Sequence, residues 1–193
     1  MNDEPRVRVL AQEELFRKGF FKWVNVRFTY RKFNGSISDP IERIVFERGA
    51  SVGMLLHDIP SNEVILVEQV RVATLPSGHG MLLEIPAGVI EGSDSPESTA
   101  HREITEETGA QPAELEHIST FYLSPGACSE RLHLFYAPYP NGLDIKEYAG
   151  LADENEDIRV HRLPVAQVMG MIKSGQIADA KTLVALLWLA RNA

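Results

Sequence analysis

Residues 88–110, GVIEGSDSPESTAHREITEETGA, carry the clearest structural signal in this 193-residue chain. Ser95 belongs to the residue types that cap the start of a helix, and Pro96 after it suits the first helical position. Gly109 can adopt the left-handed conformation that ends a helix. The stretch therefore predicts a loop containing Gly88 and a helix that begins after Ser95 and ends at Thr108.

Three carboxylates on this helix point to metal chemistry. At about 100° per residue, Glu107 lies roughly 40° from Glu103, and Glu106 roughly 60° to the other side. Like charges at this spacing destabilise a helix by about 0.2–0.5 kcal/mol per pair, so a compensating cation is expected. Mg²⁺ and Mn²⁺ take carboxylates, water and phosphate oxygens together. A solvated acidic face is the alternative, and the flanking loop, cap and glycine disfavour it.

The flanking sequence predicts an α/β fold. A turn signal at Asn34-Gly35 and a probable hairpin turn at 58–62 separate extended segments. The apolar residues of 183–189 cover nearly every side of a helix, so this helix is expected to be buried. Spacing and residue type predict strands at 20–33, 41–47, 51–57, 63–70, 82–85, 115–122, 132–137 and 157–162, with a further helix over 165–172 that ends at Gly175.

Composition narrows the class of protein. Nineteen basic and 27 acidic residues give a net charge of −8, which argues against a nucleic-acid or anionic-membrane surface. The single cysteine, Cys128, has no disulfide partner, so a reducing, cytoplasmic location is expected. The most apolar stretch, 183–190, is too short to span a bilayer. With 44% hydrophobic residues and no linker-like segment, residues 1–193 are expected to form one domain.

The segment at 88–110 resembles the signature of the Nudix hydrolase family. That signature is glycine, five residues, Glu, seven residues, then Arg-Glu-apolar-x-Glu-Glu-x-Gly-apolar. One position departs from it: the first Glu is Asp94, which keeps the carboxylate but is one methylene shorter. The positions in register are Gly88, Arg102, Glu103, Ile104, Glu106, Glu107, Gly109 and Ala110.

Other segments resemble the ADP-ribose pyrophosphatase branch of this family. The resemblance implies the Nudix fold, with a mixed β-sheet sandwiched between α-helices, a small-molecule nucleotide substrate, and a homodimer to which strands at about 20–48 contribute. The segments 72–74 and 179–182 look somewhat like a GDP-mannose-hydrolysing branch, which stays open as the alternative. A non-catalytic nucleotide sensor is the alternative from another class. The segments similar to the ADP-ribose branch are 47–49, 68–71, 86–88, 124–126, 129–131 and 153–157.

The resemblance also implies roles for single residues. The metal ligands of the family match the Ala87 carbonyl, Glu103 and Glu107, with Glu106 assisting, and the expected cofactor is Mg²⁺ or, alternatively, Mn²⁺. Arg43 and Arg71 match positions that hold substrate phosphates. The acidic segment 153–157 should carry the catalytic base, with Glu154 the best match and Glu156 a possible backup. Glu130 is left open between a substrate contact and a structural role.

Overall fold

The computed structural model describes residues 5–139, 142, 144–151 and 156–192. The chain divides into two compact units. The first consists of Met1–Gly49 with Tyr122–Arg131, and the second of Ala50–Phe121 with Leu132–Ala193. The helix with the three carboxylates belongs to the second unit.

The first unit is built on a three-stranded antiparallel sheet in the order β1-β2-β3. Its strands are β1 (Val7–Lys18), β2 (Phe21–Tyr30) and β3 (Ile41–Glu47). Strands β2 and β3 were predicted from their aromatic and β-branched residues. Strand β1 was not, because its residues are all exposed and two register shifts interrupt its pairing with β2, so it shows no regular alternation of apolar and polar positions.

Aromatic side chains pack on this sheet, but many of its apolar residues face solvent. The ring of Trp23 stacks on Phe46 with 4.5 Å between centroids, and Phe16 lies 5.5 Å from Trp23. Yet Phe16 is 56% exposed, and Ile44 on β3 is 57% exposed. A sheet of this size buries little of its own apolar surface.

The second unit contains an eight-stranded mixed sheet in the order β10-β11-β5-β4-β9-β8, to which β6 adds through β5 and β7 through β4. The predicted hairpin at 51–70 is confirmed, since Leu56 pairs with Ile65 in antiparallel strands. The strands are β4 (Ala50–Asp58), β5 (Glu63–Val70), β6 (Met81–Glu84), β7 (Ala87–Val89), β8 (Glu116–Tyr122), β9 (Arg131–Tyr139), β10 (Tyr148–Ala149) and β11 (Ile158–Pro164).

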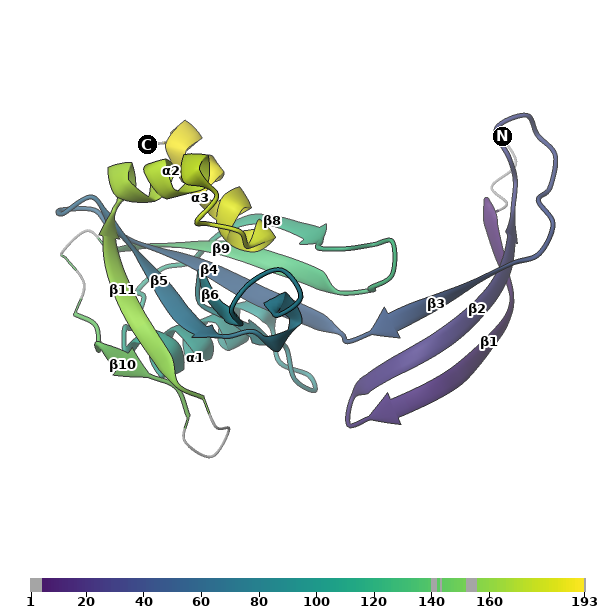
Figure 1. Cartoon of the computed structure of the whole chain (residues 1–193), viewed down its shortest axis with the longest axis horizontal. Coiled ribbons are helices and arrows are strands. Elements are labelled where there is room, and N and C mark those ends of the chain that lie inside the picture. The colour runs from purple at the N-terminus through teal and green to yellow at the C-terminus, as the bar shows by residue number, and fades with distance from the viewer. Residues whose placement is uncertain (1–4, 140–141, 143, 152–155, 193) are drawn as a thin grey trace. The chain divides into compact units, whose positions relative to one another are not determined.

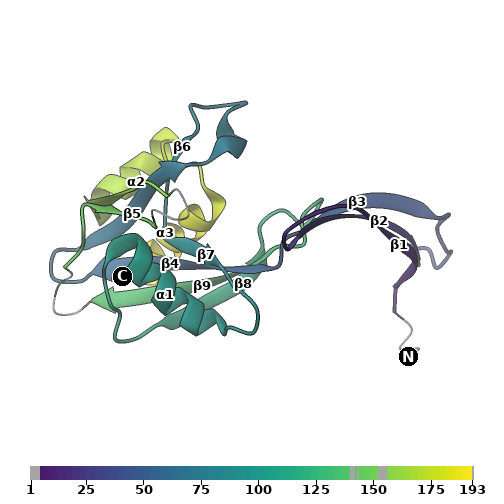
Figure 2. The same ribbon diagram turned by 90° about the horizontal axis from the view of Figure 1, so that it is seen from below.

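Three helices cover this sheet. Helix α1 (Pro96–Thr108) lies on one face, and α2 (Val165–Ser174) and α3 (Ala180–Asn192) lie on the other (Figures 1 and 2). The predicted sandwich of a mixed sheet between helices is therefore confirmed. Ile104 of α1 is fully buried in a core cluster with residues of the sheet such as Leu56 and Phe135. None of the described helices is long and apolar enough to cross a membrane.

The local signals around α1 are confirmed at both ends. The Ser95 side chain accepts a hydrogen bond from the Ser98 amide at 3.0 Å, and Pro96 occupies the first turn. Gly109 has a φ of 77°, the left-handed conformation that few other residues adopt readily. These caps set the positions of the carboxylates on the helix, because they fix where its first and last turns lie.

Two predictions are wrong. Gly88 does not lie in a loop: it belongs to the short strand β7, whose residues 87–89 pair with β4. Helix α3 is not buried on nearly every side, since Val184 is 40% and Leu187 is 56% exposed. The buried face carries Lys181, Thr182, Ala185, Leu186 and Leu189, which is the ordinary spacing of a helix on a sheet surface.

Candidate active site

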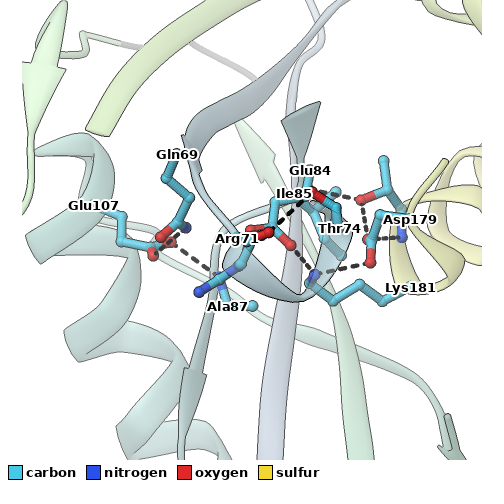
Figure 3. A network of polar contacts seen from close by, with 10 residues as sticks. Gln69, Arg71, Thr74, Glu84, Ile85, Ala87, Glu107, Asp179 and Lys181 are labelled. Carbon is cyan, nitrogen blue, oxygen red and sulfur yellow. Dashed lines mark hydrogen bonds and ion pairs between the residues drawn. The ribbon is translucent and has the colours of Figure 1, made fainter. Parts of the chain in front are cut away.

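The Glu107 side chain joins α1 to β7, the strand that precedes this helix in the chain. Its side chain is buried, with 3% of the residue exposed. One carboxylate oxygen accepts a hydrogen bond from the Ala87 amide at 2.9 Å, and the other accepts one from Nε2 of Gln69 at 3.5 Å (Figure 3). The structure thus brings together the end of α1, β5 and the start of β7 at one carboxylate.

Glu103 lies directly over Gly88. A Cβ atom built on Gly88 would stand 1.9 Å from Cδ of Glu103 and 2.0 Å from its Oε1. No side chain fits in that space, so the carboxylate can approach the backbone of β7 only because residue 88 is glycine. The glycine of the sequence signature therefore has a steric reason in this fold.

Arg102 neutralises part of the acidic face of α1. Its Nη2 lies 2.8 Å from Oε1 of Glu103, and its Nη1 donates to Oε2 of Glu106 at 2.7 Å. One guanidinium group thus bridges two of the three carboxylates. Sequence analysis counted Arg102 only as part of the signature, although its i, i+4 spacing to Glu106 is the signal for such a pair.

Burial makes the charged form of two carboxylates costly. It raises the pKa of Glu107 to about 8, opposed by the Ala87 amide and reinforced by the charges of Glu103, Glu84 and Glu156. Burial likewise raises the pKa of Glu103 to about 7, opposed by Arg102 and reinforced by Glu106 and Glu156. A cation placed between them would favour the ionised forms.

The donor set suits a hard divalent cation. Glu103 and Glu107 lie at the backbone of residues 87–88, and their raised pKa values show that burial, reinforced by neighbouring carboxylates, makes their ionised forms costly. Within the described part of the chain, however, no three His, Cys, Asp or Glu side chains converge closely enough to hold a metal ion. Metal ligation by Ala87, Glu103, Glu106 and Glu107 therefore stays a prediction.

Glu156 is electrostatically coupled to the same carboxylates, since its charge contributes to raising the pKa of both Glu103 and Glu107. Its own amide donates to the Leu151 carbonyl at 3.1 Å, and its Oε2 accepts from the Leu151 amide at 3.4 Å. Glu154, the predicted base, lies outside the described residues. The assignment of the base within 153–157 stays a prediction.

Arg71 is held by a buried carboxylate that sequence analysis missed. Its Nε donates to Oε1 of Glu84 at 2.7 Å, and Oε2 of Glu84 accepts from Nζ of Lys181 on α3 (Figure 3). Glu84 is 1% exposed. A lone acidic residue in the otherwise apolar segment 81–85 was the available signal, since buried carboxylates require charged or hydrogen-bonding partners.

Gln69 was also missed as a site residue. It lies in β5, one residue before the strand ends at Val70, and Arg71 is the first residue after the strand. Gln69 contacts Glu107 while Arg71 contacts Glu84. The predicted phosphate ligand is therefore two residues along the chain from a residue that touches the predicted metal ligand.

Two predicted substrate residues belong to the first unit. Nη1 of Arg43 donates to the Glu42 carbonyl at 2.8 Å. Glu130 is 7% exposed, and its Oε2 lies 3.4 Å from Nη1 of Arg48. This ion pair gives Glu130 a structural contact, and the substrate roles of Glu130 and Arg43 stay predictions.

Comparison with known proteins identifies the family. The NUDIX domain model matches residues 47–186, which include the whole segment 88–110. The chain belongs to the NUDIX domain family, and its predicted relationship to the Nudix hydrolases is confirmed.

Relatives within the family carry two kinds of name. An ADP-ribose pyrophosphatase of Escherichia coli is 39% identical over 184 residues, which cover 95% of this chain and 87% of the relative. One of Haemophilus influenzae is 35% identical over 190 residues, covering 96% and 87%. A GDP-mannose pyrophosphatase of Citrobacter koseri is 34% identical over 182 residues, covering 93% of each chain.

A solved structure shares the fold. The crystal structure of an ADP compounds hydrolase matches with a TM-score of 0.74 and 22% sequence identity, covering 99% of this chain and 96% of that one. At this identity the likeness supports the architecture, and it agrees with the mixed sheet between helices described above.

Replacement of Gly88 by alanine tests the steric requirement at β7. Because the new Cβ would overlap the Glu103 carboxyl group, Gly88→Ala should lower the free energy of unfolding by about 1–3 kcal/mol, the usual cost of overpacking. Gly170→Ala is the matched control, since residue 170 lies in α2 with open space around it, and alanine should stabilise a helix there. Urea unfolding of both variants measures the effect, and equal stability of Gly88→Ala and the wild type would contradict the overlap.

The raised carboxyl pKa values predict an unusual pH dependence for the metal-free protein. Between the unfolded pKa near 4.5 and the folded pKa near 8, Glu107 binds more protons when folded, so stability falls as pH rises through this range. Unfolding in a chelating buffer from pH 5 to pH 8 should show this loss, and Glu107→Gln should remove much of it. A pH profile identical for the variant and the wild type would show that Glu107 does not contribute.

Proposed function

We propose that this protein hydrolyses the diphosphate bond of a nucleoside diphosphate sugar, preferentially converting ADP-ribose to AMP and ribose 5-phosphate with the help of Mg²⁺. The observation that carries the proposal is the junction at Glu107. There the Glu107 carboxylate of α1 accepts hydrogen bonds from the Ala87 amide of β7 and from the Gln69 side chain, and Arg71 lies two residues after Gln69 in the sequence. The names of the ADP-ribose pyrophosphatase relatives supply the substrate.

The metal would be held by the Ala87 carbonyl with Glu103 and Glu107, and Glu106 would assist. Mg²⁺, or alternatively Mn²⁺, supplies charge neutralisation of the diphosphate and polarisation of the attacked phosphorus when it is bound. The raised pKa values of Glu103 and Glu107 support this assignment, because a cation would relieve the cost of ionising them.

The protein's own residues bind the substrate and move one proton. Arg71 and Arg43 hold diphosphate oxygens, since a guanidinium can donate two parallel hydrogen bonds to a phosphate. Glu154 takes a proton from a water molecule while the water oxygen forms a bond to one phosphorus. The bond from that phosphorus to the bridging oxygen breaks, and its electron pair leaves with the second phosphate. Glu156 would serve this reaction as a supporting carboxylate, and Glu130 would be a substrate contact.

GDP-mannose is the second candidate substrate. The relatives named GDP-mannose pyrophosphatase are almost as similar as those named ADP-ribose pyrophosphatase. In addition, the segment 179–182, which resembles that branch, is tied through Lys181 to Glu84 and hence to Arg71. A non-catalytic sensor is less well supported, because the three carboxylates on α1 that hydrolysis would need are all present.

A substrate panel tests the activity. We expect Mg²⁺-dependent cleavage of ADP-ribose at a higher kcat/KM than of GDP-mannose, ADP-glucose or NADH, measured as phosphate released after coupling to a phosphatase. Glu154→Gln should lower kcat by about 10²–10⁴-fold, the usual contribution of a general base, and Glu156→Gln should lower it less. Turnover that persists in excess chelator would contradict the metal role. A larger loss in Glu156→Gln would transfer the role of base to that residue.

We also propose a homodimer formed through the first unit. The support is the exposed apolar surface of its sheet, to which Phe16 and Ile44 contribute. The wild type should scatter light as a dimer at micromolar concentration, and Ile44→Lys should weaken association about tenfold or more. Ile59→Lys in the turn after β4 is the control, since Ile59 is comparably exposed but lies in the second unit. A monomeric wild type would end the proposal.

A further inference from the structure

Glu84 is a fully buried carboxylate with a cation at each oxygen. It lies on β6 with 1% of the residue exposed. Nε of Arg71 donates to one oxygen at 2.7 Å, and Nζ of Lys181, itself only 8% exposed, donates to the other. Burying a charged carboxylate is costly without such partners, so this arrangement requires both cations.

Arg71 uses only part of its hydrogen-bonding capacity in this contact. Among the described residues, its side-chain hydrogen bond runs through Nε, and 40% of the side chain is exposed. The two Nη groups form the fork that matches a phosphate or carboxylate. Fixing Nε on Glu84 fixes the plane of the guanidinium group, and therefore the direction in which this fork points.

Lys181 and its neighbours hold Glu84 from the side of α3. The Asp179 carboxylate lies 3.1 Å from Nζ of Lys181 and caps α3 by accepting from the Thr182 amide at 2.9 Å. The Thr182 hydroxyl in turn accepts from the Ile85 amide at 2.8 Å. The carboxylate and the residue after it are thus both attached to the first turn of α3, which leaves Glu84 little freedom to follow Arg71 if the arginine moves.

Glu84, Lys181 and Asp179 together form a clamp that holds Arg71. This clamp lies beside the carboxylates of α1. In Figure 3, Arg71 appears between the Glu84–Lys181–Asp179 group and the contact of Gln69 and Glu107. Arg71 is the first residue after β5 and lies two residues along the chain from Gln69, which touches Glu107.

We propose that Glu84, held by Lys181, is a positioning residue for Arg71: it orients the guanidinium group so that the two Nη groups receive the diphosphate of the substrate. The inference rests on the proposed function, in which Arg71 binds the diphosphate. Glu84 acts through Arg71 and does not itself touch the substrate. Its loss should weaken binding of the diphosphate and leave the chemistry of the α1 carboxylates unchanged.

A double-mutant cycle tests this relationship. The probe is the non-hydrolysable α,β-methylene analogue of ADP-ribose, titrated by calorimetry with Mg²⁺ into wild type, Arg71→Ala, Glu84→Leu/Lys181→Met, and the triple variant. Apolar replacement of both members of a buried ion pair is often tolerated by the fold, so the double variant separates positioning from unfolding. Arg71→Ala and the double variant should each weaken binding about tenfold. The triple variant should bind no more weakly than Arg71→Ala, because the clamp acts only through Arg71.

Leu189→Val is the matched control, because it removes a buried methylene group from α3 and leaves the polar groups around Glu84 unchanged. It should lower Tm and leave the affinity for the analogue unchanged. In steady-state assays with ADP-ribose, the double variant should raise KM about tenfold and change kcat by less than about threefold.

The outcomes separate this inference from the proposed function. If the losses multiply in the triple variant, or if the double variant binds like the wild type, Glu84 does not position Arg71, while the substrate role of Arg71 stands. If Arg71→Ala binds like the wild type, both the role of Arg71 and the inference fall. A wild-type protein that neither binds the analogue nor cleaves ADP-ribose contradicts the proposed substrate itself.

Discussion

The hydrogen bond from the Ala87 amide to the Glu107 carboxylate is the contact on which the arrangement of the candidate site depends. It ties the last turn of α1 to the start of β7, which pairs with β4 in the sheet. Glu103, one helical turn earlier, is thereby brought over Gly88. If the helix shifted along its axis, it would lose both contacts together. The same contacts therefore fix the register of α1 on the sheet and the position of its carboxylates.

The fixed position of α1 places several carboxylates in a part of the protein where water has little access to them. Glu107 is buried, Glu103 is largely so, and the burial of both raises their pKa values. Arg102 offsets part of the charge by bridging Glu103 and Glu106, while the donors to Glu107 among the described residues are the neutral groups of Ala87 and Gln69. Such a site is costly as a structural element alone, because buried carboxylates without a cation destabilise a fold. A cation bound between the carboxylates would offset this cost.

The parts of the structure that local sequence could predict are those set by neighbouring residues. Ser95, Pro96 and Gly109 mark the ends of α1 because capping depends on residues within one turn. The strands β3 and β5 have the bounds of the extended segments 41–47 and 63–70 that the sequence predicted. The exposed face of α3 was not foreseen, because an apolar residue such as Leu187 can face solvent and composition alone does not show which side of a helix meets the sheet.

Glu103, Glu106 and Glu107 could be predicted as site residues because their spacing within one helix places them on the same face. Gln69 and Glu84 lay beyond this reasoning, because their roles come from contacts with residues far along the chain. Glu107 is 38 positions from Gln69, and Lys181 is 97 positions from Glu84. An isolated polar residue in a buried strand signals that a partner exists, but only the fold shows which one.

The distance in sequence between Glu84 and Lys181 has a consequence for the order in which the molecule is assembled. The strand that carries Glu84 leaves the ribosome 97 residues before its lysine does. Until α3 docks, a nascent chain that has already formed β5 and β6 contains a carboxylate with a single cation, Arg71, on a sheet face that is still open to water. Docking of α3 closes that face and supplies the second cation in the same step. During synthesis the arginine therefore cannot reach its final geometry before α3 has emerged from the ribosome and docked.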